Sequence, residues 1–376
     1  MIAPDADRLS AEDPAQTGCE ADSVDPSPDT KAGGRGYLRL LLALLIFIGA
    51  LVVLALFAHF SWRAVAASLA TLGFGGFALY CSYTLAIFCL LGCSWYVIVP
   101  ALPLRHLPAF IFGRLMREVA SDILPFSQLG GFVVGARGAT VLGAPLVSSV
   151  ASSIVDLAAE IVGQLMFTAV GVVILAVDAP KGFPHKLLDP ILAVGLGVGV
   201  ITATLFIFSQ RLGLGLLNRF SSSWPKAIRN SISSIQVALK DLYAHPMRVV
   251  ASILLHFAAW IGAAGGVWWV LGWMGSPLSF PSVIAMESLI YLLRSAAFFV
   301  PGAVGVLEGG YVLLGPVFGL NAEVALSLSL IKRGRDLAIG LPAVLVWQVL
   351  EGRRLLGRRK SADGREERLK ASAMVR

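Results

Sequence analysis

Long apolar stretches dominate this chain, and each is long enough to cross a membrane as a helix. A bilayer core about 30 Å thick needs about 20 apolar residues in α-helical conformation. With 57% hydrophobic and only 14% charged residues among 376, a soluble domain would have no way to bury so much apolar surface. The sequence therefore predicts an all-α polytopic membrane protein with about six transmembrane helices. The six uninterrupted stretches are 38–58, 74–99, 146–177, 190–209, 247–273 and 323–350.

Two further apolar regions, 104–141 and 281–319, are interrupted by proline and glycine. Irregular backbone at membrane depth is tolerated only where protein buries it or water lines it. Each region is therefore predicted to form either a re-entrant hairpin or a pair of short spanning helices. The residues expected at the turns are Pro125, Gly130, Gly131, Pro301 and Gly302.

Lysine and arginine in the connecting segments predict the orientation, because cytoplasmic loops are enriched in them. The segment 210–248 holds six basic residues and one acid, and the segment after 350 holds nine bases and four acids. By contrast, 59–73 holds one base and 274–280 holds none. Both termini are therefore expected in the cytoplasm, and the two broken hairpins are expected to enter from opposite faces.

The chain divides into three parts. Residues 1–36 carry eight acids, three bases and four prolines, a composition typical of a disordered tail. Residues 37–350 form the predicted transmembrane domain, and 351–376 form a basic cytoplasmic tail. Within the domain, residues 224–244 are predicted to form an amphipathic helix on the cytoplasmic surface.

The transmembrane domain is predicted to contain an inverted repeat. A shift of 176 residues places Pro125 on Pro301, and it places charged residues of the third apolar stretch on charged residues of the sixth. The two units would cover about 38–177 and 190–350. Inverted repeats with broken helices that meet near the midplane are the architecture of many secondary transporters.

Charged side chains at membrane depth are the candidate functional residues. A charge at the centre of a membrane helix costs about 2.5–3.5 kcal/mol on insertion scales, so these charges must be paired or hydrated. The carboxylates of Asp156 and Glu160 are expected to face the cations at 332–335. The alternatives, which overlap, are structural ion pairs that hold the repeats together and a hydrated cavity for a polar ligand.

A second pairing is expected around the outer hairpin, where Glu287 or Glu308 would face Arg294. Residues Arg294 and Glu308 lie equally far from Pro301, so they are expected at similar depth in one polar cavity. The candidate substrate-binding residues are Glu118, Asp156, Glu160, Gln164, Glu287, Arg294, Gly305, Glu308, Lys332, Arg333, Arg335 and Asp336.

Several function classes find no support. The five histidines are scattered and no CxxC is present, so neither a metal site nor a cofactor is expected. The net charge of +7 arises between and after apolar stretches, which is typical of membrane loops and not of a nucleic-acid surface. No hydrolase or nucleotide-binding motif is present. An intramembrane lipid-modifying enzyme stays an alternative, but the expectation is a protein without enzymatic activity.

Four blocks resemble a known family: "LPFSQLGG" at 124–131, "ASSIVDLAAEIVGQLMF" at 151–167, "RSAAFFVPGAVGVLEGGYVLLG" at 294–315 and "ALSLSLIKRGRDLAIGLPAVLVWQ" at 325–348. They resemble the lysylphosphatidylglycerol-synthase-type transmembrane family, which has a flippase-like domain, and within it the hopanoid-biosynthesis-associated membrane proteins. Members commonly carry an acid and an arginine where this chain has Phe132 and Gly135, while Arg137 is retained.

The resemblance implies a protein of the bacterial cytoplasmic (inner) membrane that translocates a lipid. Its partners would be membrane lipids, through a hopanoid or phospholipid headgroup, and also enzymes of hopanoid biosynthesis. The main alternative is a non-transporting assembly or accessory subunit of that biosynthesis. Because the chain ends at 376, the soluble aminoacyl-transferase domain of full synthases is not expected in it.

Overall fold

The computed structural model describes residues 62–100, 102–123, 127–177, 226–297 and 300–374, together with Gly197 and Thr204. All of them belong to one unit, residues 42–376. Every regular element in this described part of the chain is a helix, so the predicted all-α class is confirmed for it. The tail 1–36, the predicted span 38–58, Pro125 and, apart from Gly197 and Thr204, the predicted span 190–209 lie outside the described residues.

In the part of the chain that the structure describes, three apolar helices are long enough to cross a bilayer: α2 (Trp62–Val97), α5 (Leu146–Val177) and α8 (Pro246–Trp273). The membrane-long part of α2 covers Ala70–Val97 and, like α8, has 28 residues, while α5 has 32. At about 1.5 Å per residue, 28 residues extend about 42 Å, which exceeds the bilayer core. The predicted spans 74–99, 146–177 and 247–273 are confirmed as helices of this kind.

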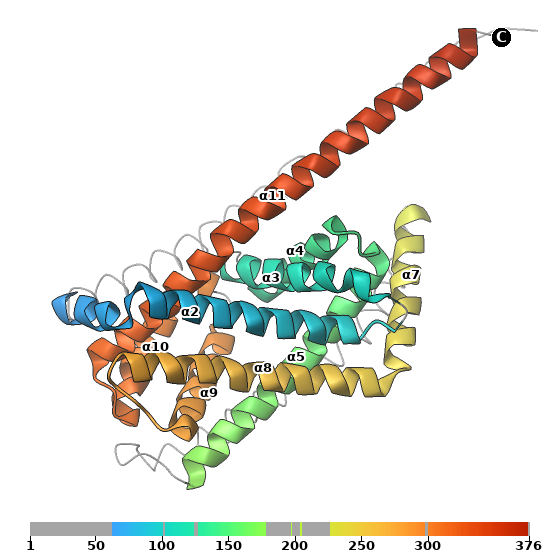
Figure 1. The fold of residues 1–376 in the computed structure, drawn as a ribbon. Coiled ribbons are helices and arrows are strands. Elements are labelled where there is room, and N and C mark those ends of the chain that lie inside the picture. Colours follow the sequence, from blue (N-terminus) through green and yellow to red (C-terminus); the bar gives the residue numbers. More distant parts are fainter. Residues whose placement is uncertain are drawn as a thin grey trace, which may run out of the picture. The chain divides into compact units, whose positions relative to one another are not determined.

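The predicted span 323–350 lies within a single longer helix, α11 (Ala322–Met374). This helix continues through most of the segment predicted as a basic tail (Figure 1). It also differs from α2, α5 and α8 because four charged residues interrupt its apolar part between positions 332 and 336. Its assignment as a membrane span therefore stays a prediction.

The first broken region forms two helices that pack side by side, α3 (Leu107–Ile123) and α4 (Ser127–Val141), after a short 3-10 turn η1 (Leu104–His106). The prediction that Gly130 and Gly131 form the turn is wrong, because both lie inside α4. Gly131 instead permits close helix approach, since a Cβ there would lie 2.1 Å from the Ser121 Oγ of α3.

The second broken region contains α9 (Phe280–Ala296), a 3-10 turn η4 (Pro301–Ala303), α10 (Val306–Leu314) and η5 (Gly315–Phe318). Its predicted turn at Pro301 and Gly302 is confirmed. Gly302 has a φ of 59°, a left-handed conformation that glycine adopts without the steric cost that a Cβ would impose.

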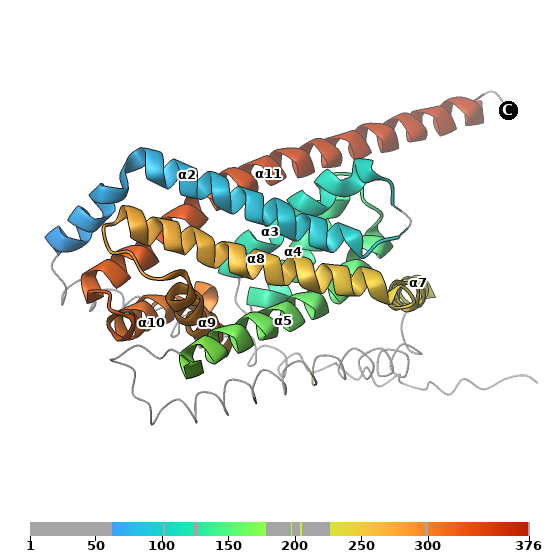
Figure 2. The same cartoon turned by 60° about the horizontal axis from the view of Figure 1, so that its bottom comes forward.

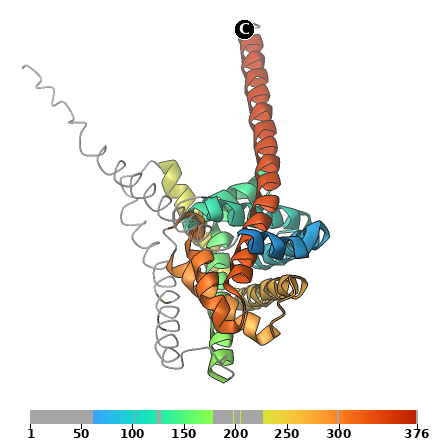
Figure 3. The ribbon, with the colours of Figure 1, turned by 90° about the vertical axis from the view of Figure 1, so that its left-hand side faces the viewer.

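The helices are held together by a small set of contacts. Helix α2 packs along α8, α5 packs on α8 and α9, and α11 packs on α2 and α10. Figure 3 shows the α9–α10 segment next to the first turns of α11. The largest apolar core is contributed by α2, α5, α8, α9 and α11.

The predicted amphipathic helix is also present, as α7 (Lys226–Tyr243). Leu239 and Leu242 are buried with Ala151 and Val155 of α5, while Lys240 and Asp241 between them are exposed. Helix α7 runs across the direction of α8 in both Figure 1 and Figure 2. One apolar face and a transverse direction are the features expected of a helix that lies at a membrane surface.

Candidate functional site

Charged side chains gather in two buried networks. The first, here called the α3–α5 network, joins Arg114, Arg117 and Glu118 of α3, Asp156 and Glu160 of α5, and His256 of α8. The second, here called the α11 network, joins Lys332, Arg333, Arg335 and Asp336 of α11 to Glu287 of α9, Glu308 and Tyr311 of α10, and Tyr80 of α2.

Asp156 is the centre of the α3–α5 network. Its Oδ2 accepts from Arg117 Nη1 at 2.9 Å and from Arg114 Nη1 at 3.3 Å, and its Oδ1 lies 2.9 Å from His256 Nε2. Glu160, one turn further along α5, accepts from Arg114 Nη2 at 2.6 Å and also from Arg117. The side chains of Asp156 and both arginines are almost completely buried. Asp156 and Glu160 therefore each accept at least two charge-assisted hydrogen bonds.

The prediction that Asp156 and Glu160 face the cations at 332–335 is therefore wrong. The physical reason is that α3 supplies two arginines at i and i+3 on one face, and their long side chains reach both carboxylates of α5. Arg114 and Arg117 were not among the predicted site residues. The signal that would have identified them is R-x-x-R-E inside an apolar helix, with Glu118 accepting from Arg114 at 2.5 Å.

In the α11 network, Lys332 donates to Glu287 at 2.7 Å and to the hydroxyl of Tyr311 at 2.5 Å. The same hydroxyl donates to the other oxygen of Glu287 at 2.5 Å. Because the Glu287 carboxylate is fully buried, this closed triangle supplies the partners that its charge requires. Tyr311 was not singled out in the sequence, since a tyrosine in an apolar helix carries no distinctive pattern.

Glu308 has two structural partners. Its Oε1 accepts from Arg333 Nε at 2.9 Å, and its Oε2 accepts from the N–H of Gly305 at 2.8 Å. The second bond caps the first turn of α10, where a negative charge is also favoured by the helix dipole. Gly305 has a φ of 80°, so its role is to make this turn, and it does not line the pocket described below.

The expected pairing of Glu287 or Glu308 with Arg294 is also wrong. Both carboxylates bond to cations of α11, because α11 lies against α10 and brings its long side chains to them. Further along the same helix, Arg335 is bound by Asp336 at 2.6 Å and donates to the hydroxyl of Tyr80 at 2.9 Å.

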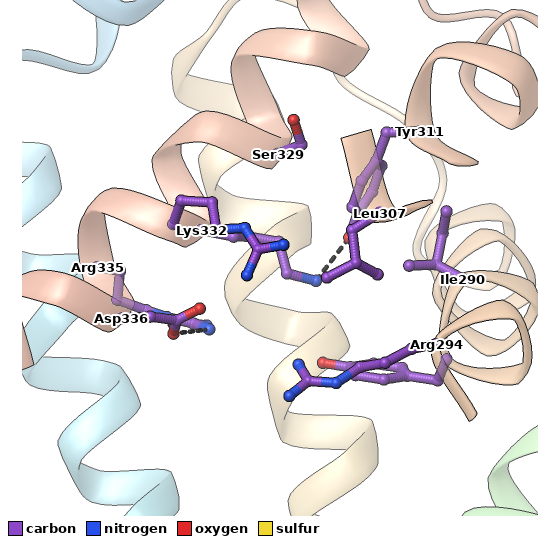
Figure 4. Close-up of a pocket in the computed structure, with 10 residues that line it drawn as sticks. Ile290, Arg294, Leu307, Tyr311, Ser329, Lys332, Arg335 and Asp336 are labelled. Atoms are coloured by element: carbon purple, nitrogen blue, oxygen red, sulfur yellow. Dashed lines mark hydrogen bonds and ion pairs between the residues drawn. The ribbon is translucent and has the colours of Figure 1, made fainter. Parts of the chain in front are cut away.

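A pocket lies between α9, α10 and α11 (Figure 4). Figure 4 shows Arg294 extending from α9 toward the α11 side chains Lys332, Arg335 and Asp336. Arg294 lines this pocket and Glu308 does not, so the prediction that the two share one polar cavity is wrong. The lining residues are Ile290, Tyr291, Arg294, Leu307, Tyr311, Ser329, Lys332, Arg333, Arg335 and Asp336.

Gln164 belongs to neither network. Its amide donates to Ser295 Oγ at 2.8 Å, which links α5 to α9 near the surface. Within the described residues, no three His, Cys, Asp or Glu side chains are placed to hold a metal ion together. The two networks offer charged hydrogen-bond donors and acceptors.

Comparison with known proteins gives one match. The family model for the lysylphosphatidylglycerol synthase TM region matches residues 40–343, a stretch that includes both charged networks. No curated protein and no solved structure matches the chain.

Proposed function

The chain belongs to the lysylphosphatidylglycerol synthase TM-region family, and on that premise we propose that it moves a polar-headed lipid between the leaflets of the bacterial cytoplasmic membrane. The protein would bind and release the lipid without changing it chemically, so no catalytic residue and no cofactor are assigned. The lipid is a hopanoid or another lipid with a polar headgroup.

The observation that supports this most directly is the pocket between α9, α10 and α11, here called the α11 pocket. It combines four cationic side chains with apolar residues, and it lies beside helices long and apolar enough to span a bilayer. Charges at this depth are costly unless they are paired or hydrated, and in known membrane proteins they mark pathways for polar substrates. A headgroup that crosses the membrane needs such a path, while its acyl chains stay in lipid.

The inverted repeat is part of the proposal, and the order of the helices supports it. A shift of 176 residues places the last residue of α2, Val97, on the last residue of α8, Trp273, and it places the first residue of α5, Leu146, on the first of α11, Ala322. The shift relates α2 to α8 and α5 to α11, and the helix contacts agree with it. Helix α5 packs on α8, and its counterpart α11 packs on α2, the counterpart of α8.

The two charged networks also correspond under this shift, with partly reversed charge. Asp156 of α5 falls on Lys332 of α11, and His256 of α8 falls on Tyr80 of α2. His256 bonds to its α5 carboxylate, and Tyr80 bonds to Arg335, an α11 cation. Two equivalent positions that hold polar groups between the same helix pairs are what an inverted-repeat transporter requires on either side of its substrate path.

The topology proposed for this transporter follows the basic loops. Both termini and α7 lie on the cytoplasmic side, about six helices span the membrane, and the α3–α4 and α9–α10 hairpins enter from opposite faces. The amphipathic character of α7 supports this placement, since α7 lies within the basic segment 210–248 that the orientation rule assigns to the cytoplasm.

A second candidate function is a non-transporting assembly subunit for the enzymes of hopanoid biosynthesis. The α3–α5 network favours it, because its central carboxylate, Asp156, is fully buried and paired with two arginines, as expected of ion pairs that only hold helices together. The α11 pocket favours transport, because its charges border an open space. A flippase and an assembly subunit differ in whether the purified protein alone moves lipid.

The test is a translocation assay in proteoliposomes. Purified protein is reconstituted with a fluorescent phospholipid, and the accessible fluorophore is bleached with membrane-impermeant dithionite. We expect faster loss of the inner-leaflet signal than in protein-free liposomes, and we expect the double variant Arg333→Gln/Glu308→Gln to abolish the difference. The matched control Arg137→Gln/Glu351→Gln neutralises an ion pair between α4 and α11 and should translocate like the parent. Equal rates with and without protein would favour the assembly subunit.

A further inference from the structure

In the α11 pocket, the cationic side chains of Lys332 and Arg333 lie between the open space and the carboxylates with which they pair. Lys332 and Arg333 line the pocket, whereas their partners Glu287 and Glu308 do not. The side chain of Lys332 is 12% exposed and that of Glu287 is 0% exposed; the values for Arg333 and Glu308 are 23% and 4%. A ligand that enters the pocket therefore meets positive charge first.

The pocket offers little to a positively charged ligand. Asp336 is its one lining carboxylate, and Arg335 already holds that group with two donors at 2.6 and 3.0 Å. The rings of Tyr291 and Tyr311 are occupied as well, because the Lys332 ammonium lies 5.2 and 5.1 Å from their centroids. An added ammonium would meet one carboxylate that Arg335 already neutralises, four cationic side chains, and two aromatic rings that already carry the Lys332 ammonium.

A donor remains for a negatively charged ligand. Arg333 Nη2 is buried and has no hydrogen-bond partner, although Nε of the same guanidinium is bound to Glu308. A buried donor left without a partner costs roughly 1–3 kcal/mol, so a ligand oxygen that satisfies it gains affinity. Guanidinium groups bind phosphate oxygens through pairs of parallel hydrogen bonds, and Arg294 lines the same pocket from α9.

The surface beside the pocket suits an acyl chain. Leu337 follows Asp336 directly, and Leu341 and Leu345 follow at intervals of four residues on the same face of α11. All three are largely exposed, so they offer an apolar strip that begins at the pocket. A headgroup in the pocket would therefore place its tail along lipid-facing leucines, which a free anion does not need.

We propose that the α11 pocket binds the phosphate group of an anionic lipid and discriminates against lipids whose headgroup ends in an ammonium. This inference rests on the proposed function, since it specifies the headgroup class that the pocket accepts. The inference also means that this pocket would not prefer lysylphosphatidylglycerol, the lipid named in the family's description. A lysyl headgroup would carry two ammonium groups toward four cationic side chains.

The test is a competition experiment on the full-length protein in an uncharged detergent. A fluorescent phosphatidylglycerol is bound first and then displaced by unlabelled phosphatidylglycerol, by lysyl-phosphatidylglycerol with the same acyl chains, or by inorganic phosphate. We expect phosphatidylglycerol to displace the probe at a concentration at least about tenfold lower than its lysyl derivative, a difference of about 1.4 kcal/mol. Equal or reversed potency would overturn the inference. Displacement by inorganic phosphate as effective as by the lipid would assign the site to a free anion and overturn the lipid assignment.

Variants locate the selectivity in the pocket. Arg333→Gln/Glu308→Gln keeps the net charge and should weaken phosphatidylglycerol binding about tenfold, whereas Arg137→Gln/Glu351→Gln should leave it unchanged. Leu307→Glu adds a carboxylate to the lining and should shift the preference toward the lysyl lipid by about tenfold, provided the variant elutes as a monodisperse species. Unchanged preference in folded Leu307→Glu would overturn the inference.

The outcomes separate this inference from the proposed function. Selective binding without translocation in proteoliposomes would retain the anionic site and reject the transporter. Translocation at equal rates for both lipids would retain the transporter and reject the selectivity.

Discussion

Asp156 shows how a single buried charge is accommodated in this protein. Its carboxylate is completely buried, yet it contacts Arg114, Arg117 and His256 at hydrogen-bonding distance. Removing one member of a buried ion pair is costly mainly because the remaining charge is left without a partner. The stability of the α3–α5 contact should therefore depend strongly on this one side chain.

We predict that Asp156→Asn lowers the free energy of unfolding by about 3–5 kcal/mol, because two buried guanidiniums lose a shared partner. The measurement is denaturant-induced unfolding in mixed detergent micelles. Asp241→Asn, on the exposed face of α7, is the matched control and should stay close to the parent. The charge swap Asp156→Lys with Lys332→Asp should not restore stability; recovery would mean that these two residues pair after all.

At the scale of the elements, the sequence predicts helices better than it predicts their contacts. The predicted spans 146–177 and 247–273 agree with α5 and α8 to within one residue, because long apolar runs with few breaks specify both the helix type and its ends. The sequence also predicted the position of the helix break at Pro301.

The sequence did not predict which charged residues pair with one another. Which cation reaches Asp156 or Glu287 depends on which helices lie side by side, and sign and depth alone leave several partners open. Arg114 illustrates this, since its pairing with α5 follows only from the packing of α3 against the bundle. The predicted candidates include the buried carboxylates of Asp156, Glu287 and Glu308 but not the buried Arg114 and Arg117, and the partners predicted for these carboxylates are wrong.

The close approach of α3 and α4 gives an element-scale prediction. A Cβ on Gly135 would lie 2.8 Å from the Cβ of Arg117, so a larger residue must push the two helices apart. We expect Gly135→Leu to destabilise the protein by about 1–3 kcal/mol, as overpacked cores do, and to disturb the Arg117 ion pairs. Gly272→Leu, in α8 with no neighbouring atom within 4 Å of its Cβ position, is the control. Equal unfolding midpoints for the two variants in the same micelles would argue against this close contact.

At the scale of the whole molecule, the account depends on two structurally related halves that face opposite sides of the membrane. Helix order, shared helix ends and exchanged contacts support that relation. Under the proposed repeat, the two charged networks would occupy equivalent positions, and of the two only the α11 network borders the α11 pocket. Such asymmetry would leave the α11 side available for a headgroup while the α3–α5 side stays closed.

The orientation gives a prediction that needs no transport assay. In a cysteine-free background, single cysteines at Lys181, Ser222 and Arg354 are probed in intact spheroplasts with a membrane-impermeant thiol reagent. Because basic segments stay in the cytoplasm, only the cysteine at 181 should be labelled before lysis. Labelling at 222 in intact cells would contradict both the orientation and the opposed hairpins.

The proposed function and the proposed headgroup selectivity both require a lipid headgroup to enter the pocket between α9, α10 and α11. The most direct measurement is photo-crosslinking of the reconstituted protein with a phosphatidylglycerol that carries a diazirine in its headgroup, followed by peptide mapping. The account predicts adducts on peptides that contain residues 290–294 and 329–336, and it predicts their loss in Arg333→Gln/Glu308→Gln but not in Arg137→Gln/Glu351→Gln. Adducts confined to other segments, or an unchanged pattern in the pocket variant, would contradict it.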